Sequence, residues 1–188
     1  DSGHSAFEPP NSRALVAATA LAAACTAAPP GSPLATVARV DVERYVGTWH
    51  EAALIPNRFQ RDCATDTTAT YTLLGDGRIG VRNRCLRADG SEMSVDGVAD
   101  VVDRTTNAKL KVSFLPAWLR WTRIGRGDYW VLYLSPDYRM AIVGEPGREF
   151  LWILSRTPTL TDEEYQALMP PVRAAGYDPQ RLRRAAAR

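Results

Sequence analysis

The chain has 188 residues, which fits one domain of ordinary size plus an extension, and 45% of these residues are hydrophobic. Charged residues make up 23%, near the globular average of about 25%, which argues against disorder over most of the length. The formal net charge is only +2, so the chain lacks the strongly basic balance of many nucleic-acid-binding proteins, and we expect no nucleic-acid partner.

Residues 1–24 are typical of a leader segment. Residues 1–12 are polar, and Arg13 is followed by eleven residues, Ala14 to Ala24, that carry no charge and are almost wholly apolar. A membrane-spanning helix needs about 20 apolar residues, so this run is too short to span. Its length and its small terminal residues are those of the hydrophobic region of a signal peptide.

Cys25 follows this run directly and resembles the lipidated cysteine of bacterial lipoproteins. In their usual motif Leu stands three places before the cysteine, whereas this chain has Ala22 there and Leu21 one place further away. The alternative is an ordinary cleavage site near Ala24 or Ala28, which would release a soluble secreted protein. Residues 25–40 begin with a Pro- and Ala-rich stretch and are predicted to be a flexible tether.

Short runs of apolar residues, separated by turn signals, predict β-strands over much of the remaining chain. Clean alternation in the earlier runs indicates antiparallel strands with one buried and one wet face. Gly75-Asp76-Gly77 is a strong hairpin turn between two of them. The predicted strands are 47–55, 65–73, 78–85, 94–101, 109–114, 129–134, 139–143 and 150–154. Eight strands at this spacing favour a sandwich or a barrel, and an eight-stranded barrel is just wide enough for one small ligand.

One helix is predicted near the end of the chain. Thr161 and Glu164 form a capping-box signature, and the apolar residues that follow favour packing on the outside of the sheet. Pro170-Pro171 predicts a break or kink in this helix. We therefore assign residues 41–180 to the barrel and helix, and residues 181–188 to a basic, disordered tail.

The sequence offers little for catalysis. It has two histidines, of which His4 lies in the leader and His50 stands alone, so a His-rich metal site is excluded. A Ser–His–Asp triad would have to be built on His50. The glycine-rich loops that hold nucleotide phosphates are also missing. We expect no metal, no cofactor and no enzymatic activity.

Cys63 and Cys85 flank the predicted hairpin in a chain that carries an export signal. Disulfides persist in oxidising compartments, so we expect these two cysteines to be bridged. The alternative is a pair of buried free thiols.

Three motifs occur in order along the chain, at 47–51 (GTWHE, preceded by Tyr45), 135–139 (SPDYR) and 153–158 (ILSRTP). Together they resemble the three signatures of the lipocalins. Finer detail over roughly residues 42–182 resembles the bacterial lipocalin (Blc) branch, which is related to apolipoprotein D and the plant temperature-induced lipocalins.

This resemblance implies an all-β fold, an eight-stranded antiparallel up-and-down barrel with one C-terminal helix packed outside. It implies that Arg156 stacks on Trp49 to close one end of the barrel, a cation–π contact worth about 0.5–2 kcal/mol. It further implies an outer-membrane lipoprotein on the periplasmic face that binds a fatty acid or lysophospholipid for storage or transfer. Without lipidation of Cys25 the protein would be secreted or periplasmic. A homodimer is left open.

The predicted ligand site is the inward face of the strands. Its expected members are Tyr71, Val81, Val95, Gly97, Ala99, Leu110, Val112 and Phe114, joined by Trp130 and Leu132 if that strand has the phase we assume. Gly97 and Ala99 would leave room for a ligand. The alternative is that these small residues match larger neighbours across a packed core.

The segment 115–127 carries Trp118 and Trp121 among arginines, a composition suited to the rim of a lipid site or to a membrane interface. It could equally fold over the barrel mouth or lie in an intersubunit contact. Two other functions remain open at this point. One is a lipocalin-scaffold isomerase, which would need a free Cys63 or Cys85 in the cavity. The other is an interaction module without a ligand that docks through 115–127.

Overall fold

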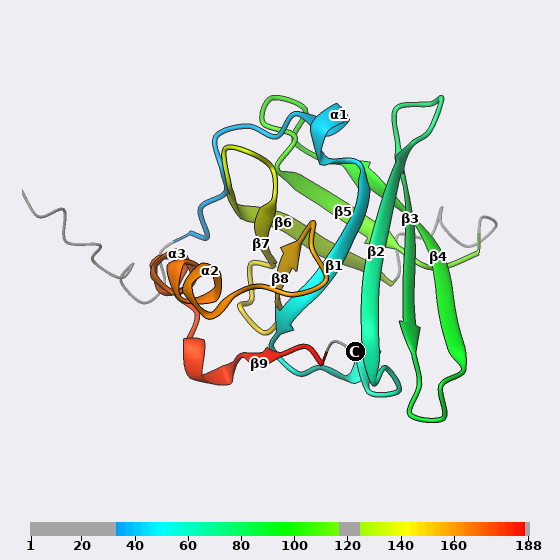
Figure 1. Ribbon diagram of the computed structural model, residues 1–188. Helices are drawn as coiled ribbons and strands as arrows, with labels where there is room; N and C mark the ends of the chain where they lie inside the picture. Colours follow the sequence, from blue (N-terminus) through cyan, green and yellow to red (C-terminus); the bar gives the residue numbers. More distant parts are fainter. Residues whose placement is uncertain (1–32, 117–124, 187–188) are drawn as a thin grey trace, which may run out of the picture.

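The computed structural model describes residues 33–116 and 125–186 (Figure 1). Nine strands form one antiparallel sheet in the order β2-β3-β4-β5-β6-β7-β8-β1-β9, and β1 also pairs with β2, which closes the barrel. The strands are β1 (Gly47–Leu54), β2 (Thr65–Leu73), β3 (Ile79–Leu86), β4 (Glu92–Val101), β5 (Lys109–Ser113), β6 (Arg126–Leu134), β7 (Met140–Gly144), β8 (Leu151–Ser155) and β9 (Arg183–Arg184). The predicted eight-stranded antiparallel barrel is confirmed.

The alternation in the sequence translates directly into burial. In β3, Ile79, Val81 and Cys85 are buried, whereas Arg82 and Arg84 are exposed. Such a strand places every second side chain in the core because successive side chains point to opposite faces.

The two ends of the barrel differ. The short helix α1 (Val42–Tyr45), capped by Asp41, lies across the upper end in Figure 1, next to the start of β1. At the opposite end lie the β1–β2 connection, which contains the 3₁₀ helix η1 (Arg58–Gln60), and the β3–β4 hairpin. We call these the closed end and the mouth.

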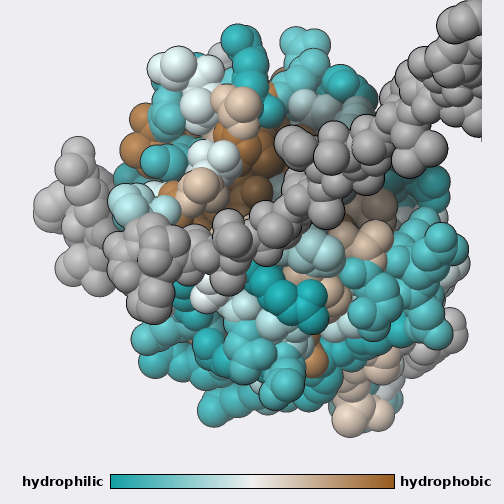
Figure 2. All heavy atoms as spheres, turned by 90° about the vertical axis from the view of Figure 1, so that its left-hand side faces the viewer, coloured by the Kyte–Doolittle hydropathy of each residue, from teal (hydrophilic) through white to brown (hydrophobic). Residues whose placement is uncertain are grey.

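Two helical segments cover one side of the barrel, α2 (Asp162–Ala167) and α3 (Met169–Ala174). The capping box of Thr161 and Glu164 is present, and the predicted break falls at Leu168, just before the two prolines. Figure 2 shows this face of the molecule: hydrophilic side chains make up most of it, and hydrophobic ones gather in its upper part.

Buried residues form two clusters on the two sides of the barrel wall. The interior cluster comprises Val40, Tyr45, Trp49, Tyr71, Ile79, Val81, Ala99, Ala108, Leu110, Val131, Ala141, Val143 and Leu154. The outer cluster, between wall and helices, comprises Leu34, Ala52, Ala53, Ile55, Ile142, Leu151, Ile153, Leu160, Leu168, Met169, Val172 and Tyr177. Strands on the helix side are therefore buried on both faces.

The structure corrects two expected boundaries. Residues 34–40 are not part of a flexible tether, because Leu34 and Val40 are buried and the Val37 N–H donates to the Val131 carbonyl at 3.0 Å. The basic tail is not disordered over residues 181–186, because β9 pairs with β1. In both cases contacts with the barrel, which have no local sequence signal, order the segment.

None of the helices within residues 33–116 and 125–186 is long and apolar enough to cross a membrane.

Candidate functional site

The barrel interior brings together much of the predicted ligand-binding set. Tyr71, Val81, Ala99 and Leu110 belong to the interior cluster and are at most 7% exposed, and Val112 packs against them partly buried. These side chains come from four successive strands, β2 to β5. Together they line an apolar wall on the side of the barrel away from the helices.

Trp130 and Leu132 do not belong to this wall, so the expected phase of β6 is wrong. Both pack against the outer cluster, whereas Tyr129 and Val131 face the interior. The error has a physical cause: β6 lies between the interior and the helices and is apolar on both faces, so alternation does not show which face is inward. Outside the barrel, the Lys109 ammonium lies 4.4 Å from the centre of the Trp130 ring.

The remaining predicted residues of β4 and β5 lie toward the mouth. Val95 and Phe114 are 44% and 41% exposed, so they are not part of the buried interior. Gly97 is needed because the Phe114 ring covers it: a Cβ on Gly97 would lie 2.6 Å from a ring carbon of Phe114. The small size of Gly97 therefore makes room for the neighbouring Phe114 ring. This corresponds to the alternative interpretation given above, in which the small residue matches a larger neighbour and does not make room for a ligand.

Trp49 and Arg156 seal the closed end of the barrel, as predicted. Trp49 is fully buried, and the Arg156 guanidinium lies 3.9 Å from the centre of its ring. Arg156 also donates to the carbonyl oxygens of Thr48, Tyr45 and Val46 at 2.9–3.0 Å, which ties the start of β1 to the end of β8. The pair is a structural feature that seals one end of the interior.

Three tyrosine hydroxyls meet inside the barrel close to Trp49 and Arg156. Tyr71 donates to the Tyr129 hydroxyl at 3.0 Å, and Tyr45 and Tyr129 share a hydrogen bond of 2.7 Å. Burial raises the pKa of Tyr71 to about 12, and it raises the pKa of Tyr45 and Tyr129 as well, so all three stay neutral. Sequence reasoning found only Tyr71, because Tyr45 lies outside the strands and Tyr129 has the opposite phase from the one assumed.

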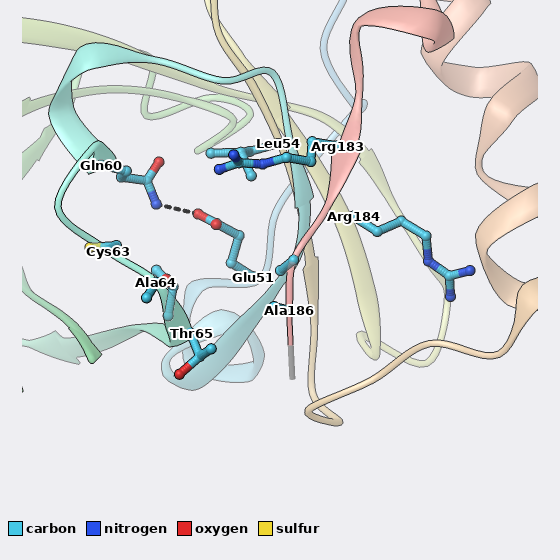
Figure 3. Close-up of a pocket in the computed structure, with 11 residues that line it drawn as sticks. Glu51, Leu54, Gln60, Cys63, Ala64, Thr65, Arg183, Arg184 and Ala186 are labelled. Carbon is cyan, nitrogen blue, oxygen red and sulfur yellow. Dashed lines mark hydrogen bonds between the residues drawn. The ribbon is translucent and has the colours of Figure 1, made fainter. Parts of the chain in front are cut away.

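A second polar group lies at the mouth, and sequence reasoning missed it. Glu51 is 8% exposed and accepts a hydrogen bond from the Gln60 side-chain amide (Figure 3). Burial raises the pKa of Glu51 to about 7, although the bond from Gln60 and the charge of Arg183 oppose that shift. The available signal was its position: Glu51 lies two residues after Trp49 on the same strand and so shares its inward direction.

Glu51 borders a cavity of about 270 Å³, whose lining also includes Leu54, Gln60, Cys63 and Arg183 (Figure 3). We call this the side cavity. A smaller space of about 20 Å³ lies beside the three tyrosines at the closed end.

Cys63 and Cys85 form the predicted disulfide. The isomerase alternative required one of these two thiols to be free, and the bridge removes both. Within residues 33–116 and 125–186 no three metal-ligating side chains come together. Cys25, Trp118 and Trp121 lie outside the described residues.

Comparison with known proteins supplies independent evidence. A family model described as a lipocalin-like domain matches residues 40–187. Temperature-induced lipocalin-1 of Arabidopsis thaliana is 44% identical over 145 residues, which cover 76% of this chain and 77% of that protein. The outer membrane lipoprotein Blc of Escherichia coli K12 is 38% identical over 167 residues, 87% of this chain and 90% of that protein. Among solved structures, insecticyanin from the tobacco hornworm Manduca sexta is similar with a TM-score of 0.66 at 19% identity, covering 82% of this chain and 85% of that one.

Proposed function

The chain belongs to the lipocalin-like family, whose members bind small hydrophobic ligands, and we propose that it binds a fatty acid or a lysophospholipid inside its barrel. The observation that carries this proposal is the apolar interior wall, which Trp49 and Arg156 seal at one end. The wall is formed by Tyr71, Val81, Ala99 and Leu110. We propose a carrier or storage role without catalysis.

The small side chain in that wall is Ala99, which is 1% exposed and lies between larger neighbours on β3 and β5. An acyl chain that enters this interior removes its methylenes from water, which contributes about 0.8 kcal/mol per CH₂. Roughly ten buried methylenes would give several kcal/mol before the costs of association. Micromolar affinity therefore needs no elaborate polar recognition.

We further propose that the protein is anchored through a lipid on Cys25 to the periplasmic face of a bacterial outer membrane. This is supported by the apolar leader that ends at Cys25 and by the similarity to proteins named outer membrane lipoprotein Blc. The lipid bound in the barrel and the membrane are the two partners in this proposal. A homodimer and a rim role for segment 115–127 remain predictions.

The test is displacement of a fluorescent fatty acid from the purified protein, with an Ala99→Phe variant that fills the interior. We expect saturable binding to the natural chain and a loss of at least tenfold in affinity for the variant. Val102→Phe is the matched control, because Val102 follows the same strand and is 61% exposed. Mass spectrometry of lipids that co-purify with the protein identifies the natural ligand. Equal binding by both variants, or no saturable binding at all, would refute the proposal.

A further inference from the structure

The side cavity exists because β1 and β2 separate toward the mouth. The two strands pair only from Gly47 to His50 on β1, and each then has an irregularity: β1 between Glu51 and Ala53, β2 between Thr65 and Thr68 in its pairing with β3. Bulges of this kind bend a strand and re-aim its side chains. The result is an opening in the barrel wall between two strands that are paired elsewhere.

The strand β9 occupies the edge of β1 that β2 has left. Arg184 and Arg183 pair with Ala53 and Leu54, and the Ala185 N–H donates to the Ala52 carbonyl at 2.9 Å. The backbone of β1 thus stays hydrogen-bonded while the wall remains open between β9 and β2. Residues of β1, β2 and β9 all line the side cavity.

One wall of the side cavity presents a carboxylate in a fixed position. The Gln60 side-chain oxygen accepts hydrogen bonds from the Trp152 indole N–H at 2.7 Å and from the Asn57 amide at 3.1 Å. These two bonds fix the orientation of the Gln60 amide group, and in this orientation its nitrogen donates to Glu51. Glu51 is therefore held as a hydrogen-bond acceptor that faces the cavity.

The opposite side presents a guanidinium. Successive side chains of β9 point to opposite faces. Arg183 and Arg184 both line the cavity, but Figure 3 shows the Arg183 side chain extending over it beside Leu54, whereas the Arg184 side chain points away. Arg184 is engaged elsewhere: it donates to Asp162 and to the Leu160 carbonyl. The cavity thus carries one negative and one positive group on different strands.

Among the residues that the structure describes, no basic side chain lies within 4.0 Å of the Glu51 carboxylate oxygens. The charge of Arg183 acts on Glu51 only from a greater distance. An ionised carboxylate in a buried position is unfavourable without a partner. A cationic group that enters the side cavity would supply this partner.

The side cavity lies next to the interior cluster, because two of its lining residues contact members or neighbours of that cluster. Glu51 lies opposite Leu154, a member of the interior cluster, and Gln60 links Glu51 to Trp152, which packs against that cluster. At about 270 Å³ the cavity is smaller than the roughly 300–1,000 Å³ of sites that enclose drug-sized ligands. It fits a polar head group better than a whole lipid.

We propose that the side cavity binds the zwitterionic head group of a lysophospholipid, with its ammonium group on Glu51 and its phosphate on Arg183. This rests on the proposed function, because the acyl chain is taken to lie in the barrel interior. Carboxylate–ammonium and guanidinium–phosphate contacts are charge-assisted hydrogen bonds, which are stronger than neutral ones. The pair of charges selects a head group that carries both signs.

The test compares three probes of equal acyl chain length on the full chain: lysophosphatidylethanolamine, lysophosphatidylglycerol, which lacks the ammonium, and neutral monoacylglycerol. On the natural protein we expect lysophosphatidylethanolamine to bind about tenfold more tightly than lysophosphatidylglycerol, since only the first has an ammonium group that can form a charge-assisted hydrogen bond with Glu51. This ranking needs no variant.

Three variants then assign the contacts. Glu51→Gln should remove the preference for lysophosphatidylethanolamine, and Arg183→Gln should weaken both phosphate-containing probes by about tenfold. Arg184→Gln is the matched control and should change neither. All three should bind monoacylglycerol as the natural chain does. Equal affinities for the two lysophospholipids, or equal effects of Arg183→Gln and Arg184→Gln, would overturn the head-group site. Failure of all three probes to bind would instead overturn the proposed function.

Discussion

Among single residues, the polar groups inside the barrel depend most clearly on specific partners. An apolar interior offers few partners, so each buried hydroxyl or carboxyl depends on one or two specific neighbours. Tyr129 is the central member of the tyrosine group, because its hydroxyl is bonded to both Tyr45 and Tyr71. Glu51 depends on Gln60 in the same way.

Replacing Tyr129 by Phe should cost more stability than replacing Tyr45 by Phe. The first change leaves two buried hydroxyls without their partner, whereas the second removes one hydrogen bond and leaves the bond between Tyr71 and Tyr129 intact. We expect losses in the free energy of unfolding of about 2–3 kcal/mol and about 1 kcal/mol respectively. Urea unfolding measures both values. Equal losses would show that the hydrogen bonds are not what stabilises this group.

Glu51→Gln should change how stability depends on pH. Folding raises the pKa of Glu51 from 4.5 to about 7, so between these values the folded chain binds more protons than the unfolded chain. Stability from this group is therefore present at low pH and is lost as pH rises toward and past 7, by up to about 3 kcal/mol. The Glu51→Gln variant should not lose stability in this way, because a glutamine side chain does not titrate.

The measurement is the free energy of unfolding of both proteins at pH 5 and pH 8. Relative to the natural chain, the variant should gain stability between the two values, and comparing the proteins at each pH cancels the other titrating groups. A constant difference between the two proteins would mean that Glu51 has an ordinary pKa.

Sequence reasoning placed residues well where a motif or clean alternation identified them, as for Trp49 with Arg156 and for Val81. It failed for Trp130 and Leu132, since a strand with two buried faces has no polar face to fix its phase. Glu51 was missed because a single charged residue on a strand looks like a solvent-facing one. Its polar partner, Gln60, lies in the 3₁₀ helix η1, where no strand periodicity could have indicated the contact.

At the scale of elements, β1 is the strand on which closure of the barrel depends. It pairs with β8 along one edge, and along the other with β2 near the closed end and β9 near the mouth. The eight main strands could be predicted from alternation and turn residues. Neither α1 nor β9 could be, because four and two residues are too few for a periodic pattern, and tertiary contacts hold both in place.

Loss of the disulfide should destabilise the mouth end of this region. Cys63, in the β1–β2 connection, and Cys85, in β3, are 22 residues apart, and closing a loop of that size stabilises a protein by about 3 kcal/mol in the chain-entropy account. We expect the double variant Cys63→Ser, Cys85→Ser to lose about that much in urea unfolding. Reduction of the natural chain should give a similar loss. An unchanged midpoint in both experiments would contradict this role.

At the scale of the whole molecule, the barrel wall separates two cores with different tasks. The outer cluster joins wall and helices, whereas the interior cluster seals the closed end and lines the proposed ligand site. The fold class could be predicted from the sequence because the eight predicted strands and the three motifs in order all indicate the same lipocalin barrel. The side cavity did not, because it arises from strand separation and the pairing of β9, which no local pattern encodes.

Cys25→Ala should move the protein from the membrane to the soluble fraction. When the full chain is produced in a Gram-negative host, the natural sequence should sediment with outer membranes, and the variant should appear in the periplasm. Fractionation followed by immunoblotting measures the distribution. Binding of a fluorescent fatty acid should be unchanged, because residues 33–116 and 125–186 form the barrel without Cys25. A variant that still sediments with the membrane would refute the lipid anchor.

The burial of Leu34 limits how far the barrel can travel from such an anchor. Leu34 is 6% exposed in the outer cluster and lies nine positions after Cys25. Nine residues span at most about 32 Å when fully extended. The ten residues of β4 extend over roughly the same length, about 33 Å. If Cys25 carries the proposed lipid anchor, the barrel would be free to turn and tilt but would stay within about this distance of the membrane surface. A ligand would then be exchanged with the nearby leaflet, or with a second carrier that comes to the protein.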